Sequence, residues 1–219
     1  MYKNWWKILG ALLVTYSTIA GFLSDVPKLA ILHESIRNLY FHVPMWFGMI
    51  VLFSVSVYHS IKFLSNNNPD HDLKAVESIN VGVIYGILGI VTGAIWAKFT
   101  WGVAWSFDVK QNFAAIALLL YFAYLVLRNA IDEEQKRAKI SAIYNIFAFP
   151  MMVVLLFVLP RLSDSLHPGN GGNPGFNAYD LDSRMRAVFY PACLGWILIG
   201  YWIYTILYRV RSLEKKNTL

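Results

Sequence analysis

Six long apolar stretches constrain this 219-residue chain more than any other feature. A helix needs roughly 20 predominantly apolar residues to cross hydrocarbon, because its backbone polar groups must pair within the helix. The chain is 57% hydrophobic and only 15% charged, whereas a soluble domain has about 25% charged residues. The sequence therefore predicts an all-α integral membrane protein, one domain of six transmembrane helices, with spans at about 6–23, 43–64, 79–98, 113–130, 141–160 and 187–208.

The distribution of lysine and arginine predicts how these spans are oriented. An even number of spans places both termini on one side of the membrane. The connections on the side of the termini, together with the termini, hold twelve of the 19 Lys and Arg residues, and the other connections hold seven. Cytoplasmic loops are enriched in these residues, so we expect cytoplasmic N and C termini. The net charge of +6 does not indicate a nucleic-acid partner, because the basic residues flank apolar stretches and form no single stripe.

Residue types that suit binding gather in the three outer connections, 24–42, 99–112 and 161–186. In the first connection the apolar residues recur at steps of three, four and three, at Leu29, Leu32, Ile36 and Leu39. This spacing predicts a short amphipathic helix on the membrane surface. Pro44 is tolerated in the first turn of the next helix, which places His42 at the mouth of the second span.

The second outer connection contains "TWGVAWSFDVKQN", residues 100–112. If this segment is helical, Trp101, Trp105 and Asp108 share one face. The plainer interpretation is a belt of aromatic residues at the membrane interface, which is common. The alternative is a flat surface that stacks on a planar apolar ligand, with Asp108 orienting a neighbouring group. The residues alone leave both open.

The five histidines divide between the two sides of the membrane. His59 lies 17 residues after His42, about 25 Å along a helix, so it belongs at the cytoplasmic end, and His71 lies in a solvated cytoplasmic loop. The outer side keeps three, at His33, His42 and His167. A glycine- and proline-rich run, Pro168 to Gly175, follows His167 and suggests a hinge, although a slack connection with an incidental histidine explains it too.

His42 and His167 flank the aromatic connection from separate spans. Two imidazoles with an aromatic shelf between them would suit the axial positions of a haem iron. They could also be half of a metal site, but no acidic or thiol ligands stand at suitable spacing nearby. Cys193 is the only cysteine, so an intramolecular disulfide, a CxxC pair and a cysteine-rich metal site are excluded.

Three features together resemble a known family. They are "RNLYFHVP" from Arg37 to Pro44, "WGVAWSFD" from Trp101 to Asp108, and a loop histidine before the sixth span. The resemblance is to cytochrome c maturation protein C, also called haem exporter protein C. It belongs to the haem-handling proteins with a tryptophan-rich (WWD) motif, which include the CcsA type.

The resemblance implies a set of site residues in the three outer connections. His42 and His167 would be the axial ligands of the haem iron, with no catalytic residue implied. The haem-binding residues would be Trp101, Gly102, Trp105, Phe107, Asp108, Arg37, Tyr40 and Lys110. Two of these depart from the family pattern. Phe107 replaces a third tryptophan and loses an N–H donor, and Lys110 replaces an arginine, so that a point charge stands where the family has a planar fork.

The resemblance also implies a function and partners. The chain would bind haem b transiently on the outer face of the bacterial inner membrane, with its functional loops in the periplasm. It would present the haem to the periplasmic haem chaperone CcmE. The ABC-type subunits CcmA and CcmB and the small subunit CcmD would be its partners, in membrane lipid. The sequence has no phosphate-binding Gly-Lys motif, so ATP hydrolysis would belong to a partner. This describes a delivery component more than a classical enzyme.

Three other functions compete with this one. A CcsA-like subunit of a cytochrome c haem synthetase would attach haem directly to apocytochrome, but such proteins normally have more spans and further intramembrane histidines. A b-type cytochrome electron carrier needs histidines well inside facing spans. A substrate transporter predicts polar residues at mid-membrane, and Asn80 and Asn145 are few and near the span ends.

Overall fold

The computed structural model describes residues 4–29, 31–167 and 181–217, and these residues contain helices and no strand. Within them, six helical segments are long and apolar enough to cross a membrane. The predicted all-α architecture with six spanning helices is confirmed. The helices are α1 (Trp5–Leu23), α2 (Leu39–Asn66), α3 (Pro69–Trp101), α4 (Val109–Asn129), α5 (Glu134–Val153) and α6 (Ser183–Asn217).

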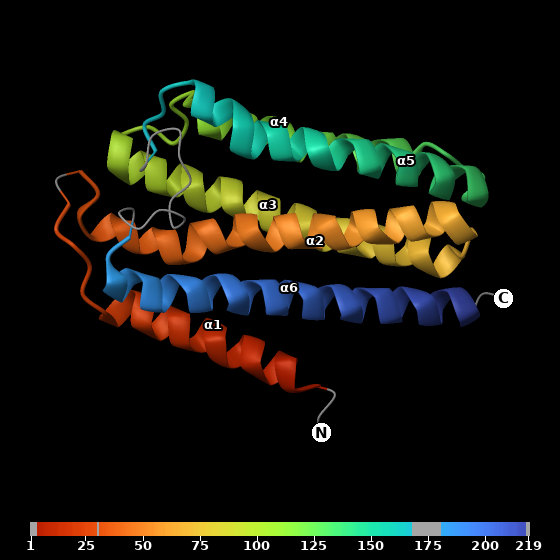
Figure 1. Cartoon of the computed structure of the whole chain (residues 1–219), viewed down its shortest axis with the longest axis horizontal. Coiled ribbons are helices and arrows are strands. Elements are labelled where there is room, and N and C mark those ends of the chain that lie inside the picture. Colours follow the sequence, from red (N-terminus) through yellow and green to blue (C-terminus); the bar gives the residue numbers. More distant parts are fainter. Residues whose placement is uncertain (1–3, 30, 168–180, 218–219) are drawn as a thin grey trace.

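The helices lie nearly side by side, as Figure 1 shows. The most extensive contact joins α2 and α3, which form an antiparallel hairpin. On one side of this hairpin α6 packs against both helices, and α1 packs against α6 at the edge of the bundle. On the other side α5 packs against α2, with α4 beside α5. The bundle therefore has a central hairpin with a second hairpin, α4–α5, on one flank.

A stacked pair of rings joins the two hairpins in the core. Phe53 of α2 stacks on Tyr121 of α4 with 3.5 Å between the ring centroids. Glycines allow such rings to approach a neighbouring helix: a Cβ added at Gly82 would lie 2.4 Å from the Phe53 ring, and one at Gly48 would lie 2.4 Å from the Tyr85 ring. Small residues at these points let α2 and α3 pack closely, as is common between membrane helices.

The end of the bundle that carries the α1–α2, α3–α4 and α5–α6 connections is called here the loop end. Its helices depart from the expected spans. A 3₁₀ helix, His33–Asn38 (η2), runs directly into α2, so the helix expected from Leu29 starts at His33, and Pro44 lies inside α2 instead of in its first turn. The α5 helix continues through a π-helical turn, Val154–Val158 (η3), and a 3₁₀ turn, Leu159–Leu162 (η4).

The α3–α4 connection corrects a second expectation. Gly102 has a φ of +81° and ends α3, because this left-handed conformation does not continue a helix. Residues 102–108 are not helical, so Trp101, Trp105 and Asp108 do not share a helix face. Asp108 instead caps α4, where its side chain accepts a hydrogen bond from the Lys110 backbone N–H. The turn at Gly102 thereby separates the two tryptophans.

Candidate functional site

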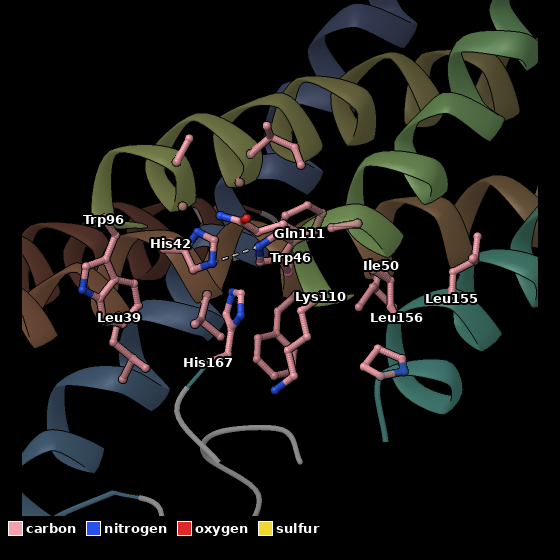
Figure 2. Close-up of a pocket in the computed structure, with 18 of the residues that line it drawn as sticks. Leu39, His42, Trp46, Ile50, Trp96, Lys110, Gln111, Leu155, Leu156 and His167 are labelled. Carbon is pink, nitrogen blue, oxygen red and sulfur yellow. Dashed lines mark hydrogen bonds between the residues drawn. The ribbon is translucent and has the colours of Figure 1, made fainter. Parts of the chain in front are cut away.

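An apolar cavity of about 170 Å³ lies at the loop end. The α2–α3 hairpin forms one side of it, and the start of α4 and the turns η3 and η4 form the other. Figure 2 shows its lining. Its apolar wall includes Phe47, Ile50, Leu155, Leu156 and Phe157. The π-helical turn after α5 supplies the last three of these. The polar and aromatic groups that line it include His42, Trp46, Trp105, Lys110, Gln111 and His167.

A smaller neighbouring cavity, about 20 Å³, shares both histidines with the first. It is also lined by Trp96 of α3 and by Trp101. His42 comes from α2 and His167 from the segment after α5, and Figure 2 shows them in one region of the site. The structure therefore brings together the two histidines that the sequence singled out, although 125 residues separate them (167 − 42).

His42 is held by groups of α2 and α3. Its Nδ1 lies 3.2 Å from the Thr92 hydroxyl oxygen, and the Trp46 indole N–H donates to its Nε2 at 3.4 Å. Thr92 uses its own proton toward the Leu88 carbonyl at 2.7 Å. The Thr92 oxygen therefore accepts from His42 Nδ1–H, which leaves the lone pair on Nε2. Gly93 makes room for the ring, since an added Cβ would lie 2.7 Å from His42 Cε1.

His167 is held by Asp108. Its Nδ1 lies 2.8 Å from Asp108 Oδ1. The other carboxylate oxygen accepts from the Leu166 backbone N–H at 2.7 Å, and Ser165 donates its hydroxyl to Oδ1 at 3.1 Å. The Trp101 ring lies edge-on to the His167 ring, with 5.1 Å between centroids. One buried carboxylate therefore fixes both the backbone and the imidazole of this segment.

The charge states of this pair follow from their surroundings. Burial alone would raise the pKa of Asp108, but the Leu166 N–H, the nearby His167 and the Lys110 N–H hold that pKa below its usual value. Burial lowers the pKa of His167; Asp108 opposes this shift, and the Lys110 charge adds to it. At neutral pH Asp108 is therefore a carboxylate and His167 a neutral imidazole that donates from Nδ1. The lone pair of His167 is then on Nε2, the usual haem-ligating atom.

The aromatic connection is fixed by Gln111. The Gln111 side-chain oxygen accepts from the Ser106 N–H at 2.9 Å and from the Ser106 hydroxyl, and its amide donates to the Ala104 carbonyl. Trp105 lines the main cavity. Phe107 has a φ of +57° and is 77% exposed. The connection thus places one tryptophan in each cavity and turns Phe107 outward.

Five residues named by the sequence do not line either cavity: among the described residues that line the two cavities, Arg37, Tyr40, Gly102, Phe107 and Asp108 are absent. Arg37 donates to the Gly21 and Ser24 carbonyls at the end of α1, at 2.9 and 2.5 Å, and pairs with Glu34. Tyr40 is buried beside Gly21. Arg37 in η2 and Tyr40 in α2 both contact α1. A haem contact for all five residues stays a prediction. The run Pro168 to Gly175, proposed as a hinge, lies outside the described residues.

Four residues of the site were not singled out by sequence reasoning: Trp46, Thr92, Trp96 and Gln111. A local signal existed for Trp46, which follows His42 by four residues and so lies on the same helix face. Thr92 and Trp96 share the same spacing on α3. Without the pairing of α2 with α3, nothing connects them to His42.

The opposite end of the bundle holds a contact between two histidines. His59 Nδ1 lies 3.0 Å from His71 Nδ1, and the Tyr204 hydroxyl lies 3.4 Å from His59 Nε2. His71 was expected in a solvated loop, and instead lies in α3, which starts at Pro69. In the part of the chain that the structure describes, no three His, Cys, Asp or Glu side chains are grouped to hold a metal ion.

These observations define a class: a multi-pass helical membrane protein with two oriented imidazoles in an apolar, tryptophan-lined cavity. The chain belongs to the Heme exporter protein C (CcmC) family, whose model matches residues 1–218. The family suggested by the motifs is confirmed, and with it a place in cytochrome c biogenesis.

Two relatives are similar over most of the chain. Heme exporter protein C of Paracoccus denitrificans is 24% identical over 193 residues, which cover 86% of this chain and 76% of the relative. Heme exporter protein C of Haemophilus influenzae is 25% identical over 189 residues, 83% of this chain and 73% of the relative. A shorter match, 37% identical over 82 residues, is to cytochrome c biogenesis protein CcsA of Prochlorococcus marinus and covers 37% of this chain and 26% of that protein.

Proposed function

We propose that this protein binds haem b transiently at the loop end, on the periplasmic side of the bacterial inner membrane, and delivers it to the haem chaperone CcmE. One observation carries the proposal. Two imidazoles from distant segments line the same apolar cavity, and each has its Nδ1 held by a partner, Thr92 or Asp108. Both rings are thereby prepared to bind through Nε2.

The chemistry of the site fits haem. Neutral imidazoles are common axial ligands of haem iron, and metal-ligating histidines usually donate their other N–H to a carboxylate or another acceptor. The apolar wall suits the porphyrin, Trp101 and Trp105 offer flat rings, and the Lys110 charge at the cavity suits a propionate. Bound haem would supply an iron that both imidazoles ligate and a reactive edge for the next carrier.

The partners are part of the same proposal. The relatives are named heme exporters, which supports an assembly with the ABC-type subunits CcmA and CcmB and the small subunit CcmD. The sequence has no phosphate-binding Gly-Lys motif. In this proposal the partner subunits hydrolyse ATP, and this chain binds and presents the haem.

The similarity to CcsA favours a second candidate function. In it, the chain is a subunit of a haem synthetase that attaches haem directly to apocytochrome c. Incubation of the haem-loaded protein with apocytochrome c separates the two candidates. Covalent attachment without a chaperone would favour the synthetase, and attachment that needs CcmE would favour delivery.

The test of haem ligation is the visible absorption spectrum of the purified full-length protein with haem. We expect a low-spin spectrum in the wild type, and lost or high-spin haem in His42→Ala and in His167→Ala. His33→Ala is the matched control, since His33 is an outer histidine that is not among the described residues lining either cavity. A wild type that binds no haem, or haem that is indifferent to both His42 and His167, would contradict the proposal.

A further inference from the structure

The two histidines of the site are held in different ways. His167 donates to a buried carboxylate that is itself fixed by backbone N–H groups. His42 donates to a neutral hydroxyl, that of Thr92. Hydrogen bonds to ionised groups are roughly twice as strong as those between neutral groups. The carboxylate therefore makes His167 the firmer and more electron-rich of the two prospective ligands.

Among the described residues, the prospective iron-ligating atom of His42, Nε2, has a hydrogen-bond partner, and that of His167 has none. The Trp46 indole N–H donates to His42 Nε2 at 3.4 Å, and the dashed line in Figure 2 marks this contact. The lone pair that accepts this bond is the one that an iron would need. The bond is long and therefore weak, so iron can displace it, but it still favours the empty site. Close packing against Gly89 fixes Trp46 in place: a Cβ added at Gly89 would lie 2.7 Å from the Trp46 ring.

We propose that Trp46 is a positioning residue that holds the Nε2 lone pair of His42 in the haem-free site and takes it back during release. His42 is then the exchangeable ligand, and His167 is the one that stays. This inference rests on the proposed function, because it needs haem to bind at His42. Thr92 takes part by fixing the tautomer: without its acceptor, the proton of His42 could move to Nε2 and block that atom.

The chain contains a matched control for Trp46. Trp96 lies on the facing helix, and its ring centroid is 6.0 Å from that of His42 at an interplanar angle of 74°. For Trp46 the corresponding values are 6.1 Å and 81°. The Trp96 N–H donates instead to the Ser35 hydroxyl at 3.1 Å. Both indoles thus flank His42 equally, and only Trp46 competes for Nε2.

The experiment compares Trp46→Phe with Trp96→Phe in the full-length protein in lipid nanodiscs. Haem titration gives the affinity, and transfer to excess apomyoglobin gives the dissociation rate. We expect Trp46→Phe to bind haem about two- to fivefold more tightly than Trp96→Phe and to release it more slowly, since one weak hydrogen bond is removed from the empty state. A role in packing alone predicts the opposite sign, because a smaller ring would weaken binding. Equal or weaker binding by Trp46→Phe would therefore overturn the inference.

A second measurement needs no tryptophan variant. NMR spectra of the haem-free wild type, labelled with ¹⁵N at histidine, report which ring nitrogen carries the proton. The His42 signals are identified by their loss in His42→Gln. We expect an unprotonated Nε2, a mixed signal in Thr92→Val and recovery in Thr92→Ser. A protonated His42 Nε2 in the wild type would refute the inference even if Trp46→Phe failed to fold.

The two levels of the proposal fail in different ways. If wild-type haem does not depend on His42 and His167, the proposed function fails. If it does depend on both, and Trp46→Phe still behaves like Trp96→Phe, haem binding stands and the role of Trp46 is wrong.

Discussion

Asp108 serves two structural elements with the same two oxygens. It caps α4 through the Lys110 N–H, and it holds the segment after α5 through His167 and Leu166. Its side chain is only 2% exposed, so these bonds are little weakened by water. A helix cap alone needs any small polar residue, whereas orienting an imidazole through Nδ1–H benefits from a carboxylate. The charge of Asp108 therefore matters beyond its capping role.

This predicts a difference between two capping aspartates. Asp108→Asn should lower the free energy of unfolding by about 1–3 kcal/mol, because bonds to a buried ionised group are lost. It should also reduce the low-spin fraction of bound haem. Asp182→Asn is the control, since Asp182 accepts the Arg184 N–H in the same way at the start of α6, without a histidine. Thermal unfolding in detergent, followed by circular dichroism, measures the first effect. Equal effects of the two substitutions would show that capping alone matters.

At the scale of the helices, glycines of α3 set how closely α2 approaches the site. Gly89 faces Trp46 and Gly93 faces His42. The Cβ that an alanine would add at either glycine would lie 2.7 Å from the facing ring. The two glycines are four residues apart, so they lie on one face of α3. The position of His42 therefore depends on the packing of two whole helices.

Gly93→Ala should displace the His42 ring and lower the low-spin fraction of bound haem. Its effect on unfolding should be small, because the His42 ring borders a cavity into which it can move, and alanine favours the helix by up to about 1 kcal/mol. Gly48→Ala makes the comparison, since its Cβ would meet the Tyr85 ring at 2.4 Å, away from the cavity lining. That variant should lose about 1–3 kcal/mol of stability through overpacking and keep the haem spectrum. Absorption spectra and unfolding curves of both variants decide the matter.

The spans could be predicted from the sequence because apolar length is a local property. The positions where helices begin and end near the site could not be predicted. The α2 helix begins before Pro44 and includes it, and Gly102 ends α3 through its positive φ. Contacts between residues far apart in the sequence could not be predicted either. His42 meets Thr92 across 50 residues and His167 meets Asp108 across 59, and such contacts depend on which helices pack together. The motif indicated that Asp108 would orient a neighbour, but only the fold identifies His167 as that neighbour.

For the whole molecule, the three connections around the site lie at one end of the bundle. The α2–α3 turn, the α4–α5 turn and the end of α6 lie at the other end, and α1 begins part-way along the bundle. The excess of lysine and arginine in these two turns and the termini predicts that this side is cytoplasmic. Long helices such as α3, with 33 residues, and α6, with 35, exceed the roughly 20 residues that a bilayer requires. Their ends therefore reach beyond the hydrocarbon.

Single cysteines test this orientation in a Cys193→Ala background. Ser163→Cys marks the loop end and Asn67→Cys the α2–α3 turn, and both positions are exposed. A thiol reagent that does not cross membranes should label Ser163→Cys in intact spheroplasts, and should label Asn67→Cys only after the membrane is permeabilised. The reverse pattern would place the site in the cytoplasm.

The shared use of Asp108 has a consequence for biosynthesis. The carboxylate that begins α4 also holds His167, which is synthesised 59 residues later, after α4 and α5. A nascent chain in which α4 has not formed, or in which α5 has not yet brought His167 back to the loop end, has one oriented imidazole at most. The pair of oriented imidazoles is thus completed only when the second hairpin is in place. Under the proposed function, an unfinished chain would be unable to bind haem through both ligands.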